Sequence, residues 1–347
     1  MERKIDFFSH KNVVEEMPSV PDENGKFKSY SSGSFSLTTK CNLDLCEYCY
    51  SRTETSKTPY MSFEDFKKAL SWLQEVCDTP EVNFLGGEPL THPEIIKFLD
   101  ELALHKWKAH IYTNGFFEKS RCDMLVNHQG VKVICFHYDE MFVKKVPEYE
   151  NRIFSNMEAF QSSTVESQLI FVINKPDFNY EAPFRLAKKY GLTLLWGFSA
   201  PTSGNTPFVG LETIRKMGPN LQEFLLKCKK AGIKTAAAFP FPLCMFEENF
   251  LRQYKDEFAF IYYCRPLIYF KPDLSTQFCS SIQNFLTRPL KNVEEVREFI
   301  RNNRETDAAL KRRPTFSECT DCSYHLNAIC QGACMRYKFY GNPDKMK

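Results

Sequence analysis

Between residues 33 and 240, short apolar segments alternate with amphipathic ones, and this alternation is the feature that most constrains the fold. Strand-like segments are expected at 34–38, 81–87, 108–112, 131–136, 168–174, 192–198 and 233–239. Helical periodicity fills the intervals at 62–76, 91–102, 118–126, 149–160, 181–190 and 220–230. Strands alternating with helices indicate a parallel sheet with crossover helices, either open or closed as a barrel. Six or seven such units fit here, fewer than the eight of a full barrel.

Local signals support two of the helix starts. Ser62 is expected to cap the first helix, with Asp65 three residues later at the capping-box position. Thr91 and Glu94 offer a second capping box, for the helix that runs to about residue 102.

Three regions are expected along the chain. Residues 1–32 are polar and mixed in charge, and they form an extension ahead of the alternating region 33–240. After Pro240 the alternation stops, and residues 241–347 are rich in aromatic residues and cysteines, with one amphipathic helix near 292–302. We therefore place a domain boundary near residue 240.

Charge and hydropathy exclude several classes of function. The net charge is +2, and basic residues are scattered among acidic ones, which argues against nucleic acid as a partner. No run approaches the roughly 18 apolar residues of a membrane span. The first 20 residues carry charges throughout and lack the apolar core of a secretory signal. These features predict a cytoplasmic protein that does not enter the membrane.

The chain contains 14 cysteines, and in a reducing compartment clustered cysteines more often bind metal or carry out redox chemistry than form disulfides. Cys41, Cys46 and Cys49 lie within nine residues, directly after the first predicted strand. Three thiolates in one loop suit an iron–sulfur cluster or zinc. A structural zinc needs a fourth ligand from elsewhere, whereas a [4Fe–4S] cluster with three cysteines keeps one iron open.

Two further motifs stand at strand ends. Gly86-Gly87-Glu88-Pro89 ends the second predicted strand, and Thr113-Asn114-Gly115 ends the third. Each is an ordinary turn by itself. Following a three-cysteine loop in this order, they resemble the radical S-adenosylmethionine (radical SAM) family, whose signature cysteines follow the first barrel strand. The usual cysteine spacing is three residues and then two; here it is four and then two.

The resemblance implies an α/β fold, namely a partial (β/α)6 TIM-type barrel, with roles for individual residues. Cys41, Cys46 and Cys49 would ligate a [4Fe–4S] cluster whose open iron binds S-adenosylmethionine (SAM). An electron donor such as flavodoxin or ferredoxin is implied. Tyr48 would lie near the adenine of SAM, and Asn174 would contact the ribose. The methionine amino group would be held by Gly86, Gly87, Glu88 and Pro89. Thr113, Asn114 and His137 would also bind SAM. A buried core histidine is an equally good interpretation of His137.

A second group of cysteines lies beyond residue 240. Cys319, Cys322, Cys330 and Cys334 are closely spaced, and Cys264 and Cys279 precede them. This pattern resembles the SPASM/twitch extension, which binds auxiliary [4Fe–4S] clusters, although Leu274 stands where that family has a glycine. One or two auxiliary clusters are implied. One allocation puts Cys244, Cys264, Cys279 and Cys334 on one cluster and the other three on a second, open or completed by Asp344; zinc remains an alternative.

Four more cysteines, Cys77, Cys122, Cys135 and Cys228, lie apart from these groups and are expected to be buried, inert thiols. No catalytic acid or base can be singled out. Tyr138, Asp139 and Glu140 follow the fourth strand and are candidates for a general base if the reaction is a net oxidation.

These features favour a radical SAM oxidoreductase or maturase that oxidises or cross-links a side chain of a ribosomal peptide. A dehydrogenase or other modifier of a small molecule, such as an aminocyclitol or sugar, is the alternative, and a non-enzymatic iron–sulfur or zinc scaffold is a remote one. About 30 residues precede the barrel, too few for an N-terminal leader-binding domain. A peptide-modifying enzyme would then use a separate leader-binding protein as partner.

Overall fold

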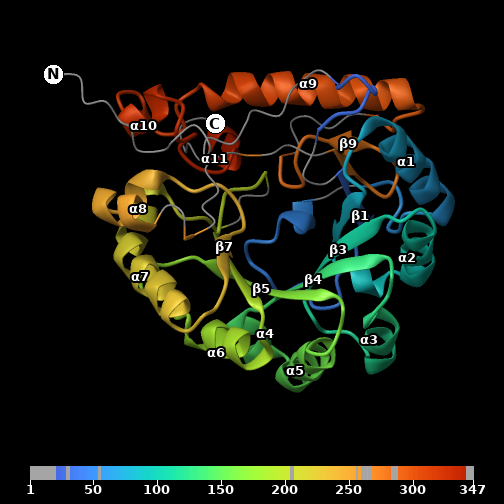
Figure 1. The fold of residues 1–347 in the computed structure, drawn as a ribbon, viewed down its shortest axis with the longest axis horizontal. Helices are drawn as coiled ribbons and strands as arrows, with labels where there is room; N and C mark the ends of the chain where they lie inside the picture. The colour runs from blue at the N-terminus through green and yellow to red at the C-terminus, as the bar shows by residue number, and fades with distance from the viewer. Residues whose placement is uncertain are drawn as a thin grey trace.

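The computed structural model describes residues 21–28, 32–53, 56–203, 207–254, 257–258, 264, 268–282 and 288–340. Asp344 and most of the 1–32 extension therefore lie outside the described residues. Figure 1 shows a curved sheet with helices around its outer face.

The sheet confirms the predicted α/β architecture. Its strands are β1 (Gly33–Thr38), β2 (Glu81–Gly86), β3 (Lys108–Thr113), β4 (Val131–His137), β5 (Glu166–Ile173), β6 (Thr193–Phe198), β7 (Thr235–Ala237), β8 (Tyr269–Phe270) and β9 (Thr276–Gln277). Their order is β7-β6-β5-β4-β3-β2-β1-β8-β9, and neighbouring strands from β7 through β8 are parallel. Strand β9 joins β8 antiparallel. Among the described residues the sheet is open, because β7 and β9 stand at opposite edges.

Helices connect the strands and cover their outer side (Figure 1). The barrel helices are α1 (Phe63–Val76), α2 (Ile95–Leu104), α3 (Lys119–Leu125), α4 (Glu140–Lys145), α5 (Tyr149–Phe160), α6 (Glu181–Tyr190) and α7 (Leu211–Lys230). The later helices are α8 (Glu248–Tyr254), α9 (Val293–Lys311), α10 (Ser323–Leu326) and α11 (Arg336–Tyr340). Short 3-10 turns in the described residues are η1 (Tyr50–Thr53), η2 (Pro89–Thr91), η3 (Leu243–Met245) and η5 (Ser317–Cys319).

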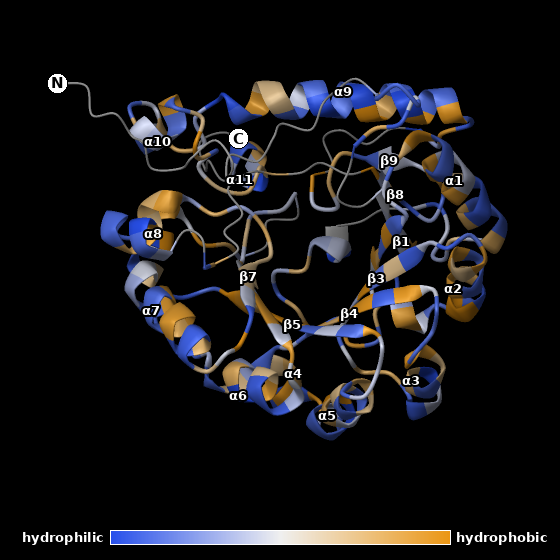
Figure 2. Ribbon diagram, in the orientation of Figure 1, coloured by the Kyte–Doolittle hydropathy of each residue, from blue (hydrophilic) through white to orange (hydrophobic). Residues whose placement is uncertain are grey.

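The core lies between the helices and the sheet. Helix α1 begins as predicted, since the Ser62 side chain accepts a hydrogen bond from the Asp65 amide. The apolar face of α1 packs on the sheet, where the ring of Phe66 meets Phe35 edge-on at 5.0 Å between ring centroids. Figure 2 shows the corresponding division of the helices into apolar and polar faces. Each fully buried side chain of this size contributes about 1.5–3 kcal/mol.

Several local predictions were wrong. The Thr91 capping box does not form: Thr91 closes η2, and α2 begins at Ile95 without a side-chain cap. Helix α7 starts at Leu211 and includes Pro219, so it begins well before the expected start at residue 220. Helix α9 runs to Lys311, well past the expected end near 302.

Strands β8 and β9 were not predicted, because each has only two residues. They extend the same sheet beyond β1, so residues on both sides of position 240 contribute to one sheet. The three-region division at 1–32, 33–240 and 241–347 stays a prediction.

Candidate active site at the carboxyl ends of the strands

A cavity of about 670 Å³ opens at the carboxyl ends of the parallel strands, the face on which barrel enzymes build their sites. The loops after β1 through β4 supply much of its wall, and β5, β6 and the cysteine-rich region complete it. The predicted residues that line it are Cys41, Cys46, Tyr48, Cys49, Gly86, Gly87, Glu88, Thr113, Asn114 and His137. Most of the positions that the family resemblance implies therefore lie around one cavity.

The three cysteines of the loop after β1 lie at this cavity, each partly buried. Burial raises the pKa of the Cys46 thiol, and the nearby Cys49 and Cys41 thiols raise it further. As thiolates these three sulfurs would repel one another, and they suit a positively charged centre that accepts soft ligands. The donor set therefore fits an iron–sulfur cluster.

The four-residue spacing between Cys41 and Cys46 includes a turn at Asp44. Asp44 adopts a left-handed backbone conformation with φ of 46°, and its amide donates to the Cys41 sulfur at 3.4 Å. Arg52 holds the turn, because its Nε donates to the Asp44 carboxylate at 3.0 Å and its NH2 to the Asp44 carbonyl. The longer spacing is thus absorbed as one tight turn ahead of Cys46.

The glycines after β2 bring two chain segments into close contact. The amides of Gly87 and Glu88 donate to the carbonyls of Thr38 and Lys40 at 2.7 and 2.8 Å. A Cβ at Gly86 would lie 2.3 Å from the Thr38 oxygen, and one at Gly87 would lie 2.2 Å from the Lys40 oxygen. Only glycine permits this approach. The GGEP motif therefore fixes the residues that lead into the cysteine loop.

Glu88 is almost fully buried, and its carboxylate is already engaged. One oxygen accepts from the Leu90 amide and the Thr113 hydroxyl at 3.0 and 2.8 Å, and the other accepts from the Asn114 amide at 2.7 Å. Burial raises the pKa of Glu88 to about 7. The described contacts tie the ends of β2 and β3 together. The expected contact of Glu88 with a methionine amino group stays a prediction. The same holds for Pro89, which begins η2.

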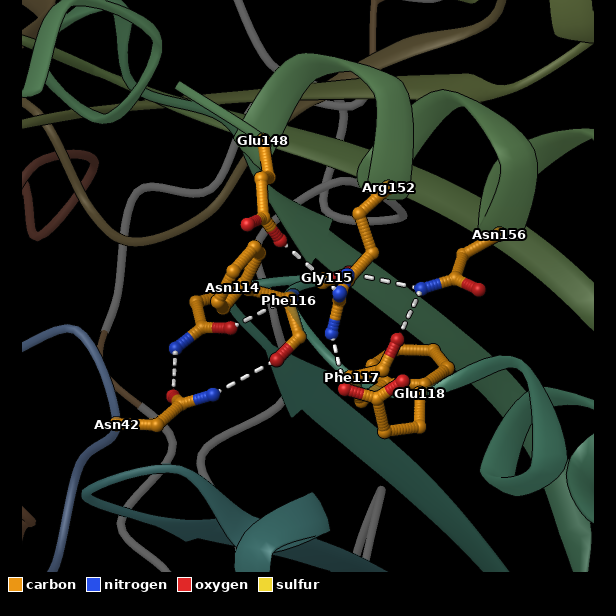
Figure 3. Close-up of polar contacts among 9 residues, drawn as sticks. All are labelled: Asn42, Asn114, Gly115, Phe116, Phe117, Glu118, Glu148, Arg152 and Asn156. Carbon is orange, nitrogen blue, oxygen red and sulfur yellow. Dashed lines mark hydrogen bonds and ion pairs between the residues drawn. The ribbon is translucent and has the colours of Figure 1, made fainter. Parts of the chain in front are cut away.

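Asn114 extends this linkage to the cysteine loop (Figure 3). Its side-chain nitrogen, Nδ2, donates to the side-chain oxygen of Asn42 at 2.8 Å and lies 3.8 Å from the Cys41 sulfur. Asn42 in turn donates to the Phe116 carbonyl at 2.7 Å. Asn156 of α5 supports the turn after β3 by donating to the Gly115 and Phe117 carbonyls. Neither Asn42 nor Asn156 was singled out from the sequence, because nothing in their surroundings marks them.

Tyr48 joins the loop to the end of β4. Its hydroxyl donates to Asp139 at 2.5 Å and lies 3.1 Å from the His137 Nε2. Asp139 also caps α4 by accepting from the Met141 amide. Burial raises the pKa of Tyr48 well above its ordinary value and lowers that of His137. A neutral His137 would therefore face the cavity beside Tyr48.

Asn174 is exposed after the end of β5, whereas Ile170 and Val172 of that strand line the cavity. Its assignment to the ribose stays a prediction. Cys77, Cys122, Cys135 and Cys228 are all buried as expected, although Cys135 also borders the cavity.

The cysteines beyond residue 240 form two neighbourhoods. Cys264 donates a hydrogen bond to the Cys334 sulfur, and Cys279 lies near Cys334; we call these the three-thiol group. Cys244, Cys319, Cys322 and Cys330 lie near one another and form the four-thiol group. Arg336 donates from Nε to the Cys334 sulfur at 3.4 Å and lines the cavity, as do Ser280 and Ser281. The three-thiol group thus borders the candidate active site.

Within the described residues, no three His, Cys, Asp or Glu side chains are arranged to hold a single metal ion. A zinc ion would require its thiolates about 2.3 Å from one atom. An iron–sulfur cluster places several irons between its ligands and accepts wider thiol separations. Among the described residues, no helix is long and apolar enough to cross a membrane.

Comparisons with known proteins agree with this geometry. Residues 35–182 match the family model described as the Radical SAM superfamily. An uncharacterized protein, MJ0907 of Methanocaldococcus jannaschii, is 22% identical over 201 residues, which span 57% of this chain and 58% of that protein. The matched region is thus little more than half of the relative's length.

Two solved structures share the fold across most of the chain. SuiB of Streptococcus suis, bound to its precursor peptide SuiA, superposes with a TM-score of 0.64 at 14% identity, covering 94% of this chain and 76% of SuiB. The protein anSMEcpe with bound AdoMet gives a TM-score of 0.63 at 16% identity, covering 87% of this chain and 89% of that chain. At these identities the likeness establishes the fold alone.

Proposed function

We propose that this chain is a radical SAM enzyme that oxidises or cross-links a peptide side chain. The observation that carries the proposal is the convergence of the Cys41, Cys46 and Cys49 thiols, the glycine cradle after β2 and Tyr48 around one cavity. The family match over residues 35–182 supports the chemistry. A bound, reduced [4Fe–4S] cluster would supply the electron that cleaves SAM into methionine and a 5′-deoxyadenosyl radical.

The chain's own residues would position the reactants. The GGEP backbone and Glu88 fix the loop that carries Cys41, so that its thiol stays at the cavity wall. Tyr48 and His137 line the same cavity and offer a hydroxyl and a ring nitrogen, suited to the polar groups of SAM. Phe142, Phe198 and Phe239 line other parts of the cavity and would exclude water from a radical.

A peptide substrate is supported by the resemblance in fold to SuiB, whose structure contains a precursor peptide. A small molecule is the second candidate, because a cavity of about 670 Å³ lies within the usual range of about 300–1,000 Å³ for small-ligand sites. SAM would take up part of that volume. The remainder would then admit one side chain or one small molecule.

The test is anaerobic reconstitution with iron and sulfide, followed by a dithionite-driven assay for 5′-deoxyadenosine. Formation of deoxyadenosine supports the proposal, whereas bound zinc without deoxyadenosine indicates a scaffold and overturns it. The substrate class is then tested with a panel of short synthetic peptides, in parallel with aminocyclitols and sugars. Mass change of the peptide supports a maturase; oxidation of only the small molecules contradicts it.

A further inference from the structure

Cys244 lies far from the other C-terminal cysteines in sequence but beside three of them in space. It belongs to η3, and its thiol is close enough to Cys319 and Cys322 for their charges to interact. Arg215 of α7 donates to the Cys244 thiol and lies 3.9 Å from Glu318, the residue before Cys319. One guanidinium therefore contacts both chain segments.

The Cys244 side chain is exposed, but the backbone beside it is closely packed. A Cβ at Gly218 of α7 would lie 1.9 Å from the carbonyl oxygen of Met245, so η3 rests directly on the helix backbone. Next to Cys244, the Leu243 backbone donates to the Cys330 thiol, and the Gly332 amide donates to the same sulfur at 3.2 Å. Backbone donors of this kind stabilise a sulfur that carries negative charge, as a metal-bound thiolate does.

The segment from Cys330 to Cys334 then turns away. Gly332 has φ of 93°, and a Cβ there would meet the Cys319 sulfur at 3.1 Å. Gln331 is fully buried, and its side chain accepts from the Cys264 amide at 2.8 Å and donates to the Cys264 sulfur at 3.4 Å. Cys330 and Cys334 are therefore directed to different thiol groups, although only four positions separate them.

We propose that Cys244 is the fourth ligand of an iron–sulfur cluster held by Cys319, Cys322 and Cys330. Cys264, Cys279 and Cys334 then form a separate site with one cysteine fewer, beside the cavity. This division differs from the sequence-based allocation, which placed Cys244 with Cys264, Cys279 and Cys334. The inference rests on the proposed function only in assuming that the chain binds iron–sulfur clusters.

The test uses full-length protein in which Cys41, Cys46 and Cys49 are alanine, so that only the C-terminal clusters are counted. Two variants are made from this protein. In the first background Cys264, Cys279 and Cys334 are also alanine, and in the second Cys319, Cys322 and Cys330 are also alanine. In the first background we expect about four irons per chain, as one [4Fe–4S] cluster requires. There, Cys244→Ala should lower iron and sulfide at least twofold and change the electron paramagnetic resonance signal of the reduced protein.

In the second background Cys244→Ala should leave the iron content and the signal unchanged. The reverse pattern, with loss only in the second background, would overturn the proposal, as would zinc in place of iron in the first. Cys228→Ala, which removes a buried thiol from α7, is the matched control in both and should change neither value.

A milder variant covers the case in which the multiple substitutions do not fold. In the otherwise unchanged holoprotein, Cys244→Ser should alter the same resonance signal as Cys319→Ser and not the one altered by Cys279→Ser. If Cys244→Ser instead alters the signal that Cys279→Ser alters, the allocation is overturned. Deoxyadenosine formation is measured separately on the unchanged protein, so its absence counts against the proposed function and not against the ligand assignment.

Discussion

The two cysteine-bearing regions hold their thiols by different means. Around Cys41, the main chain is fixed by hydrogen bonds from the residues that follow β2. Strands β1 and β2 are paired within a large parallel sheet. Around Cys330, the chain runs between the short helices α10 and α11, and much of its support comes from side chains such as Gln331 and Thr315. A loop anchored by a sheet is organised before metal binds, whereas a loop without one gains much of its order from the metal.

The largest effect is expected from breaking the barrel site itself. Cys41→Ala removes one of three thiols, and we expect deoxyadenosine formation to fall below detection while the circular dichroism spectrum is retained. Cys319→Ala, in the four-thiol group, should reduce product formation far more than SAM cleavage. If the two variants lose both activities equally and show the same folding defect, the C-terminal thiols have only a structural role. Cys122→Ala, a buried thiol on α3, is the control.

Removing iron should separate the two regions. In apoprotein prepared with a chelator, we expect amide exchange in residues 315–340 to accelerate by more than roughly tenfold, because that segment loses its metal anchor. Strands β2 to β5 should keep their protection. Hydrogen exchange followed by mass spectrometry measures both in one sample. Equal protection of residues 315–340 with and without iron would show that side chains alone order the C-terminal thiols.

Gly87→Ala tests how rigid the barrel cradle is. The added Cβ would lie 2.2 Å from the Lys40 carbonyl oxygen, and backbone cannot move aside as a flexible side chain can. We expect a loss of about 1–3 kcal/mol in the free energy of unfolding and a strong loss of SAM binding. Gly210→Ala is the matched control, because a Cβ there meets nothing within 4 Å. Urea unfolding and equilibrium dialysis give the two quantities; equal behaviour of both variants would contradict a tight cradle.

The same contrast explains what the sequence could predict. The strands were predictable because apolar periodicity reports burial, and the strand-end motifs were located because parallel strands end at one edge. Helix α7 was predicted only from residue 220, whereas it starts at Leu211 and continues through Pro219, a residue that ordinarily disrupts a helix interior. The spatial neighbours of Cys244 could not be inferred, since spacing along the chain does not record the contact of Gly218 with Met245.

Glu88 predicts a pH dependence confined to the barrel. Its pKa is raised from 4.5 to about 7 by burial, so the folded state binds its proton more tightly than the unfolded chain does. This stabilises the fold at low pH, and the contribution is lost as the pH rises from about 4.5 to about 7. The change is about 3 kcal/mol as an order of magnitude. Urea unfolding of apoprotein at pH 5 and pH 7.5 should show the decline, and Glu88→Gln should flatten it; an equal decline in the variant would contradict the assignment.

Tyr48→Phe should have the smallest effect, because the loop that carries Tyr48 is held by several other contacts. The change removes the hydroxyl that donates to Asp139 and lies beside His137, while the backbone contacts of the cysteine loop remain. One lost hydrogen bond is worth about 1 kcal/mol, so SAM should bind roughly fivefold more weakly. Tyr180→Phe, which removes a hydroxyl bound to Glu223 on the outer helices, should leave SAM binding unchanged. A loss from Tyr48→Phe as large as that from Gly87→Ala would mean that this hydroxyl, rather than the strand ends, fixes the geometry of the cysteine loop.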